Sequence, residues 1–435
     1  MINVNREYRR RLLMPDAAIA GIKSGDTIVH GGSVAEPPAL LTALAERVRQ
    51  GELSNLKIYS SLPMQHASRT VLSADLSDCI ESYSWFATEA DRSRHKVGLS
   101  SYVPTYIHQI PRLLREHMKV DFMLTTVSPM DKFGYFTFGA VNDYTGAAAR
   151  NCQTLIVEVN ENMPRVLGDT LLHVSEVDVI VENHVPLLEV HAPEPGPQDD
   201  IIGRCVAGMI PDGATVALGI GGIPNAIGRH LLSHRNLGIH SGTFTPAMVE
   251  LIEKGVINGS NKSLHPRKHI FVVAQGIRHM YDFIHNNPSM ESHPASYTED
   301  PAVIARNDNM IAVNTVIEVD LTGQCNAEHM AGSQFSGTGG QLDFVRGAYN
   351  SRGGRSIQAF LSTARKGSVS RIVPQLKSGT AVTVPRMDTH YLVTEYGAVN
   401  LKGKSTRDRA LGIIGLAHPD FRDRLLRAAE DMYLL

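Results

Sequence analysis

The sequence predicts an α/β fold divided into two domains. Short runs rich in β-branched residues alternate with longer helical patterns along the 435 residues, which is typical of parallel sheets covered by helices. The runs read as apolar on both faces rather than alternating, as expected of strands that are buried on both faces. A chain of this length is expected to form two or three domains.

The individual elements follow from these patterns. Helices with one apolar face are predicted over Pro38–Val48 and Ala247–Lys254. The predicted strands are Thr27–Val29, Phe122–Val127, Leu155–Val159, Val177–Val181, Thr215–Leu218, Ile270–Ala274 and Met310–Val313.

A proline-rich stretch separates the two predicted domains. Residues His191–Asp200 contain the run Pro193-Glu194-Pro195-Gly196-Pro197, which is too rich in proline for a helix or a central strand. We therefore predict a linker here, with one domain over residues 1–190 and the other over residues 200–435.

A weak internal repeat indicates that the two halves are related. Residues Ile28–Pro37 and Val216–Pro224 both read as a strand, paired glycines and a proline, followed by a helix. Their similar position within each half favours duplication over coincidence.

Composition excludes several classes of function. Hydrophobic residues make up 43% and charged residues 20% of the chain, and the net charge is −2. We therefore expect neither nucleic acid nor a membrane surface as a partner. No run of about 18 apolar residues and no signal peptide is present, so we expect a cytoplasmic protein. The cysteines have no paired spacing, which predicts free thiols and no metal site; they are Cys79, Cys152, Cys205 and Cys325.

Two glycine-rich segments are candidates for ligand binding. Gly219–Pro224 lies where a predicted strand turns into a helix, so backbone N–H groups there can approach a phosphate or an oxyanion; a tight turn without a ligand is the alternative. This segment does not match GxGxxG, so we reject a nucleotide-binding dehydrogenase. Ser336–Phe344 is followed by the basic segments Arg352–Arg355 and Thr363–Ser368, a grouping that suits the phosphates and pantetheine of a large cofactor.

These two glycine-rich segments, with four others, resemble the acetyl-CoA hydrolase/transferase family, whose members include 4-hydroxybutyrate, butyryl and itaconate CoA-transferases. The resemblance covers nearly the whole chain and is specific for the family but not for the substrate. It rests on Gly31–Pro37, Asn162–Asp169, Gly219–Pro224, Ser336–Phe344, Thr394–Ser405 and His418–Arg422.

The resemblance implies two tandem CoA-transferase-type α/β domains with parallel-rich sheets. It implies a reaction in which coenzyme A moves from an acyl-CoA to a small carboxylic acid through a glutamyl anhydride and a glutamyl-CoA thioester. It further implies a homo-oligomer, a dimer or tetramer. By the family pattern, the backbone N–H groups of one loop would stabilise the oxyanions; its residues are Gly219, Ile220, Gly221, Gly222 and Ile223. The residues that would contact CoA are Gly339, Gly340 and Lys366.

The chain departs from this pattern at the nucleophile. In the segment Leu237–Phe244, Gly242 stands where the transferases have their glutamate. Glycine cannot form an anhydride, and loss of a covalent nucleophile typically costs ~4–8 kcal/mol of barrier. The usual mechanism with this residue is therefore excluded.

Three interpretations remain. In the first interpretation another carboxylate replaces the glutamate, and Glu36 is the leading candidate. The alternative role for Glu36 is structural or substrate-orienting. In the second interpretation CoA is transferred directly, or water hydrolyses the thioester, with His240 or Glu36 as the base. The third is a non-catalytic acyl-CoA-binding protein. Residues expected near the acyl group are Val34, Met64, His66, Ser241 and Phe244.

Overall fold

The computed structural model describes residues 3–435, which divide into two compact units. The first unit contains the chain up to Val190 together with Ile270–Thr298 and Ser333–Gly339. The second contains His191–His269, Glu299–Gly332 and Gly340–Leu435.

Two segments that lie within the predicted 200–435 domain therefore belong to the first unit. Ser333–Gly339 contacts the first unit through the Phe335 carbonyl, which accepts a hydrogen bond of 2.7 Å from Arg92 Nε. For Ile270–Thr298 the reason is strand pairing over a long sequence distance. Strand β14 (Met290–Ser292) pairs in parallel with β8 (Leu167–Gly168). An isolated bridge also joins Val273 to Val141.

A parallel sheet of seven strands forms the centre of the first unit. The apolar runs read from the sequence fill its middle, as strands buried on both faces require. In spatial order the strands are β10 (Val179–Glu182), β7 (Cys152–Val159), β5 (Val120–Val127), β1 (Thr27–His30), β2 (Leu56–Ser61), β3 (Ile80–Phe86) and β4 (Ser100–Tyr102).

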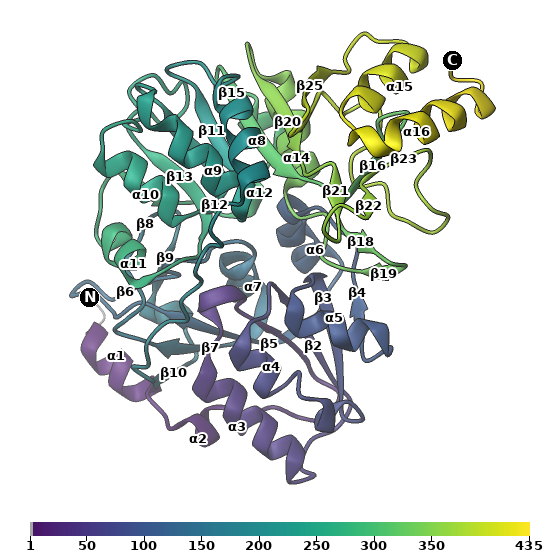
Figure 1. Ribbon diagram of the computed structural model, residues 1–435. Coiled ribbons are helices and arrows are strands. Elements are labelled where there is room, and N and C mark those ends of the chain that lie inside the picture. Colours follow the sequence, from purple (N-terminus) through teal and green to yellow (C-terminus); the bar gives the residue numbers. More distant parts are fainter. Residues whose placement is uncertain (1–2) are drawn as a thin grey trace. The chain divides into compact units, whose positions relative to one another are not determined.

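Helices cover both faces of this sheet. Figure 1 shows α2 (Pro15–Ala18) and α3 (Pro38–Arg49) on one side and α6 (Ile110–Glu116) and α7 (Thr145–Asn151) on the other. The inner face of α3 places Leu40, Leu41 and Leu44 against the strand residues Ile28 and Leu124 in one buried cluster. Other helices of this unit are α1 (Val4–Arg11), α4 (Gln65–Arg69), α5 (Glu89–Lys96), α11 (Arg278–Ile284) and α12 (Ala295–Thr298).

The second unit is built on a run of six adjacent strands. All pair in parallel except the outer pair β24–β25, which is antiparallel. In spatial order they are β25 (Gly397–Asn400), β24 (Tyr391–Thr394), β20 (Arg355–Ala359), β15 (Met310–Thr315), β11 (Thr215–Leu218) and β12 (Gly238–Phe244).

Helices flank this second sheet as well, and α8 and α9 lie side by side in Figure 1. Two further helices, α15 and α16, form the C-terminal pair. The helices of this unit are α8 (Pro197–Ala207), α9 (Gly222–His230), α10 (Pro246–Glu253), α13 (Pro301–Ile304), α14 (Gln341–Asn350), α15 (Thr406–Gly415) and α16 (Pro419–Asp431).

The prediction that His191–Asp200 contains no helix is wrong at its C-terminal end. Helix α8 begins at Pro197, because a proline at the first helical position loses no hydrogen bond and has the right φ. The Asp199 carboxylate accepts a hydrogen bond from the Gly196 N–H at 2.9 Å and caps this helix.

The α/β fold and its main elements are otherwise confirmed. Each predicted strand overlaps an observed strand, and α3 and α10 match the two predicted helices. Both copies of the repeat are strand–loop–helix units, β1 to α3 and β11 to α9. Among residues 3–435, no helix combines the length and apolar character needed to cross a membrane.

Candidate active site

A cavity of about 100 Å³ opens at the carboxyl ends of three neighbouring strands of the second unit, β12, β11 and β15. In open α/β sheets this edge is where ligands bind. The first turn of α14 also contributes to the cavity. The lining residues are Ala217, Leu218, Gly219, Ser241, Gly242, Thr243, Glu299, Val313, Asn314, Gly340, Gln341 and Phe344.

The glycine loop predicted from the sequence forms one edge of this cavity. Gly219 follows β11 directly, and no heavy atom lies within 4 Å of the position that a Cβ would occupy there. Gly221 precedes α9 with a φ of 130°, a conformation that favours glycine. The N-terminal end of α9, with its partial positive charge, therefore follows the cavity edge by only a few residues.

The neighbouring strand β12 also borders the cavity and carries two of the predicted residues. Ser241 and Gly242 line the cavity, whereas His240 is fully buried within the strand. Side chains two residues apart share a face of a strand, so His240 lies on the same face as position 242, one step further from the cavity.

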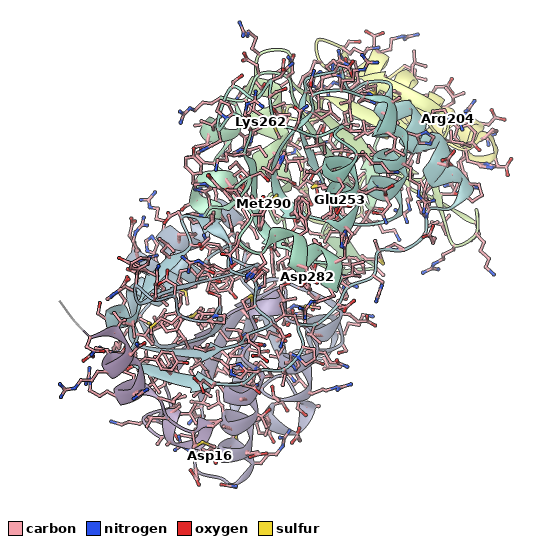
Figure 2. The ribbon with its side chains drawn as sticks, turned by 90° about the vertical axis from the view of Figure 1, so that its left-hand side faces the viewer. Asp16, Arg204, Glu253, Lys262, Asp282 and Met290 are labelled. Carbon is pink, nitrogen blue, oxygen red and sulfur yellow. The ribbon has the colours of Figure 1, made fainter. Side chains whose placement is uncertain are left out.

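A buried lysine holds the beginning of β12. The Lys262 Nζ donates hydrogen bonds of 2.7 Å to the backbone oxygens of Ile239 and Lys268, and its stem fills the space beside Gly238. Figure 2 labels Lys262 among the side chains of the second unit. A charge-assisted bond to the backbone of β12 keeps the register of the strand that presents Gly242.

A carboxylate that the sequence analysis did not select lies directly beside Gly242. The Glu299 side chain is 5% exposed. A Cβ at Gly242 would lie 2.5 Å from Glu299 Oε1 and 3.2 Å from its Cδ. A Cβ at Gly340 would lie 2.8 Å from the same Cδ. The carboxylate therefore occupies space that exists because both of these residues are glycine.

Helix α13, which packs against α14, positions Glu299. Glu299 precedes α13 by two residues, and the Asp300 side chain caps that helix by accepting a hydrogen bond of 2.8 Å from Ala302 N–H. Helix α13 packs closely on α14, since a Cβ at Gly347 would lie 2.5 Å from Ile304. Phe344 of α14 lines the cavity and joins the same buried cluster as Ile304.

Glu36, the leading carboxylate of the sequence analysis, lies in the first unit and is 2% exposed. It accepts hydrogen bonds from the backbone N–H groups of Met64 at 2.5 Å, His66 at 3.1 Å and Ala67 at 3.2 Å. Burial raises the pKa of Glu36 to about 7, although the three N–H donors act in the opposite direction.

The cavity beside Glu36 has a volume of only about 10 Å³, which is the space of roughly one water molecule. Val34 and His66 also line it. Because burial lowers the pKa of His66, its neutral form is favoured. The bonds to the backbone favour a structural role for Glu36, which remains one of the alternatives stated above.

The other predicted CoA contacts are distributed over both units. Gly339 belongs to the first unit and has a φ of +58°, with Phe86 close to where its Cβ would lie. Gly340 caps α14 in the second unit and lines the cavity. Lys366 is exposed in the turn between β21 (Thr363–Ala364) and β22 (Val369–Ser370).

Comparison with known proteins identifies the family. Residues 2–189 match the acetyl-CoA hydrolase/transferase N-terminal domain, and residues 276–429 match the C-terminal domain of the same family. The chain belongs to the acetyl-CoA hydrolase/transferase family.

Individual relatives match over nearly their full length. The chain is 41% identical over 420 residues to the 4-hydroxybutyrate coenzyme A transferase of Clostridium kluyveri, covering 96% of this chain and 97% of that protein. It is 46% identical to RipA from Yersinia pestis, whose crystal structure superposes with a TM-score of 0.96 over 100% of both chains. A crystal structure of the 4-hydroxybutyrate CoA-transferase abfT-2 from Porphyromonas gingivalis is 35% identical with a TM-score of 0.84, over 98% of this chain and 99% of that one.

Proposed function

We propose that the protein is an acyl-CoA:carboxylate CoA-transferase that moves coenzyme A between small organic acids. The relatives named as CoA-transferases match it from end to end. The observation that carries the proposal is the cavity of about 100 Å³ at the strand ends, which holds a single carboxylate, Glu299. A space of this size accommodates the carboxyl end of a small acid.

The arrangement favours transfer of CoA over hydrolysis. Glu299 is almost fully buried, so its carboxylate itself has little contact with bulk water. Exclusion of water protects a reactive acyl intermediate until the next substrate arrives. Backbone N–H groups of the Gly219–Ile223 loop, at the edge of the cavity, are suited to stabilise the oxyanion that forms when the thioester is attacked.

The test is to incubate the protein with an acyl-CoA in the presence and absence of a panel of free carboxylic acids. Free thiol and new CoA esters are both followed. New esters that form only when the acid is present support the transferase. Free thiol released without any acid would indicate a hydrolase, and binding of CoA esters without either product would indicate a binding protein.

We also infer that the enzyme is a cytoplasmic homo-oligomer, a dimer or tetramer, as the family resemblance implies. Sedimentation velocity of the purified protein tests the oligomeric state, and a monomer at micromolar concentration would contradict it.

A further inference from the structure

We propose that Glu299 supplies the nucleophilic carboxylate of this enzyme, entering the active site from the segment before α13 instead of from β12. This inference rests on the proposed function. The family pattern would place the glutamate at Gly242, whereas Glu299 lies 57 positions further along the chain.

A side chain at residue 242 is incompatible with the present position of the Glu299 carboxylate. A Cβ on residue 242 would lie 2.5 Å from Glu299 Oε1, closer than non-bonded atoms tolerate. Any glutamate at 242 would therefore require Glu299 to move. Gly242 thus leaves open the space in which the Glu299 carboxylate now lies.

Glu299 is also the lining residue with the chemistry of a nucleophile. Among the described residues that line this cavity, Glu299 alone has an acidic or basic side chain. The N-terminus of α14 begins beside it, at Gln341. The positive end of a helix dipole stabilises the carboxylate and also the oxyanion of a tetrahedral intermediate formed beside it.

Glu36 differs from Glu299 in its hydrogen bonds and in the space beside it. Three backbone N–H groups bind the Glu36 oxygens at 2.5 to 3.2 Å, and the adjoining cavity of about 10 Å³ cannot hold an acyl group. The cavity beside Glu299 is about ten times larger, at about 100 Å³. A nucleophile needs room for the reacting carbonyl within about 3 to 3.5 Å.

The proposed reaction needs no reactant other than the acyl-CoA and the acceptor acid. A Glu299 oxygen attacks the thioester carbonyl, the C–S bond breaks, and CoA leaves as a thiolate, so that an acyl-glutamyl anhydride forms. The thiolate attacks Cδ of Glu299 and releases the acyl group as a free carboxylate, leaving a glutamyl-CoA thioester. The acceptor carboxylate then displaces CoA to form a second anhydride, and CoA attacks the acceptor's acyl carbon, which regenerates the Glu299 carboxylate.

The experiment traps the intermediate on the natural protein and maps it. The enzyme is incubated with an acyl-CoA, treated with hydroxylamine or borohydride, and digested, and the modified glutamate is located by mass spectrometry. Glu299 is expected to be converted to the hydroxamate or the alcohol. Modification of Glu36 instead, or CoA exchange without any modified glutamate, would overturn the inference.

Variants separate this inference from the proposed function. Glu299→Gln is expected to lower CoA exchange by about 10³-fold or more while CoA still binds, and Glu250→Gln, an exposed carboxylate on α10, serves as the matched control. The double variant Gly242→Glu/Glu299→Gly is expected to exchange CoA faster than Glu299→Gly alone, with the trapped adduct at residue 242. Full exchange by Glu299→Gln would refute the role of Glu299 but leave the transferase intact, whereas absence of exchange by the natural protein would refute the proposed function itself.

Discussion

The substitution Gly242→Ala adds one methyl group at the point where the structure places the Glu299 carboxylate. The new Cβ would lie 2.5 Å from Oε1, whereas ordinary contact begins near 3.4 Å, so the carboxylate must retreat by about 0.9 Å. A misplacement of about 1 Å at a reacting group costs about 100-fold in rate, or about 2.7 kcal/mol of barrier. Because the displaced atom is the end of a flexible side chain beside a cavity, the free energy of unfolding should change little.

The assay is the initial rate of CoA-ester formation from an acyl-CoA and a carboxylic acid, together with urea unfolding. Gly415→Ala is the matched control, because no atom lies within 4 Å of its Cβ position. If the methyl group acts through the carboxylate, Gly242→Ala should lose no further rate once Glu299 is glutamine, so the two effects are not additive. Unchanged kcat/KM in Gly242→Ala would refute the placement of Glu299.

Three further outcomes follow from the structure. Burial raises the pKa of Glu36 from 4.5 to about 7, so the stability it contributes is fully present below pH 4.5 and lost as the pH rises through 7. In urea unfolding at several pH values, Glu36→Gln should therefore gain about 3 kcal/mol relative to the natural protein between pH 4.5 and 8; a difference that does not vary with pH would contradict this. Gly347→Ala places a Cβ 2.5 Å from Ile304 and should lower the free energy of unfolding by about 1–3 kcal/mol. The exchange reaction should also be slower. An unaltered rate and an unaltered thermal or urea unfolding would argue against close packing of α13 on α14. Asp300→Ala removes the cap of α13 and should lower the free energy of unfolding by about 1 kcal/mol. Because Glu299 is then misplaced in more of the molecules, kcat should fall with KM unchanged, and a change confined to KM would contradict that explanation.

The elements that the sequence predicts well are those fixed by local rules. The mainly apolar runs at Phe122–Val127 and Leu155–Val159 lie in two interior strands of the first sheet, as short runs that are apolar on both faces predict. The glycine loop at Gly219–Pro224 follows β11 and leads into α9, since the strand and helix on each side can be read from a few residues. By the same rules Pro197 could have been recognised as a helix start.

The residue that completes the site could not be found in this way. The Asp300-Pro301 pair is a readable helix start, yet nothing near Glu299 in the sequence indicates that it meets Gly242. That contact joins segments separated by 57 residues and depends on how α13 packs against α14. Gly242 was the one indication in the sequence. A glycine in place of a catalytic glutamate indicates that another side chain occupies the space of the missing one.

The most direct test of the account follows oxygen atoms through one reaction cycle. In the proposed mechanism, one oxygen of the acceptor carboxylate remains on the glutamate when CoA attacks the second anhydride. The enzyme, loaded with acyl-CoA and turned over with an ¹⁸O-labelled carboxylic acid, should therefore carry ¹⁸O in the side chain of Glu299, as shown by mass spectrometry of the digested protein. Label at Glu36, or turnover that leaves no label in the protein, would contradict the central claim.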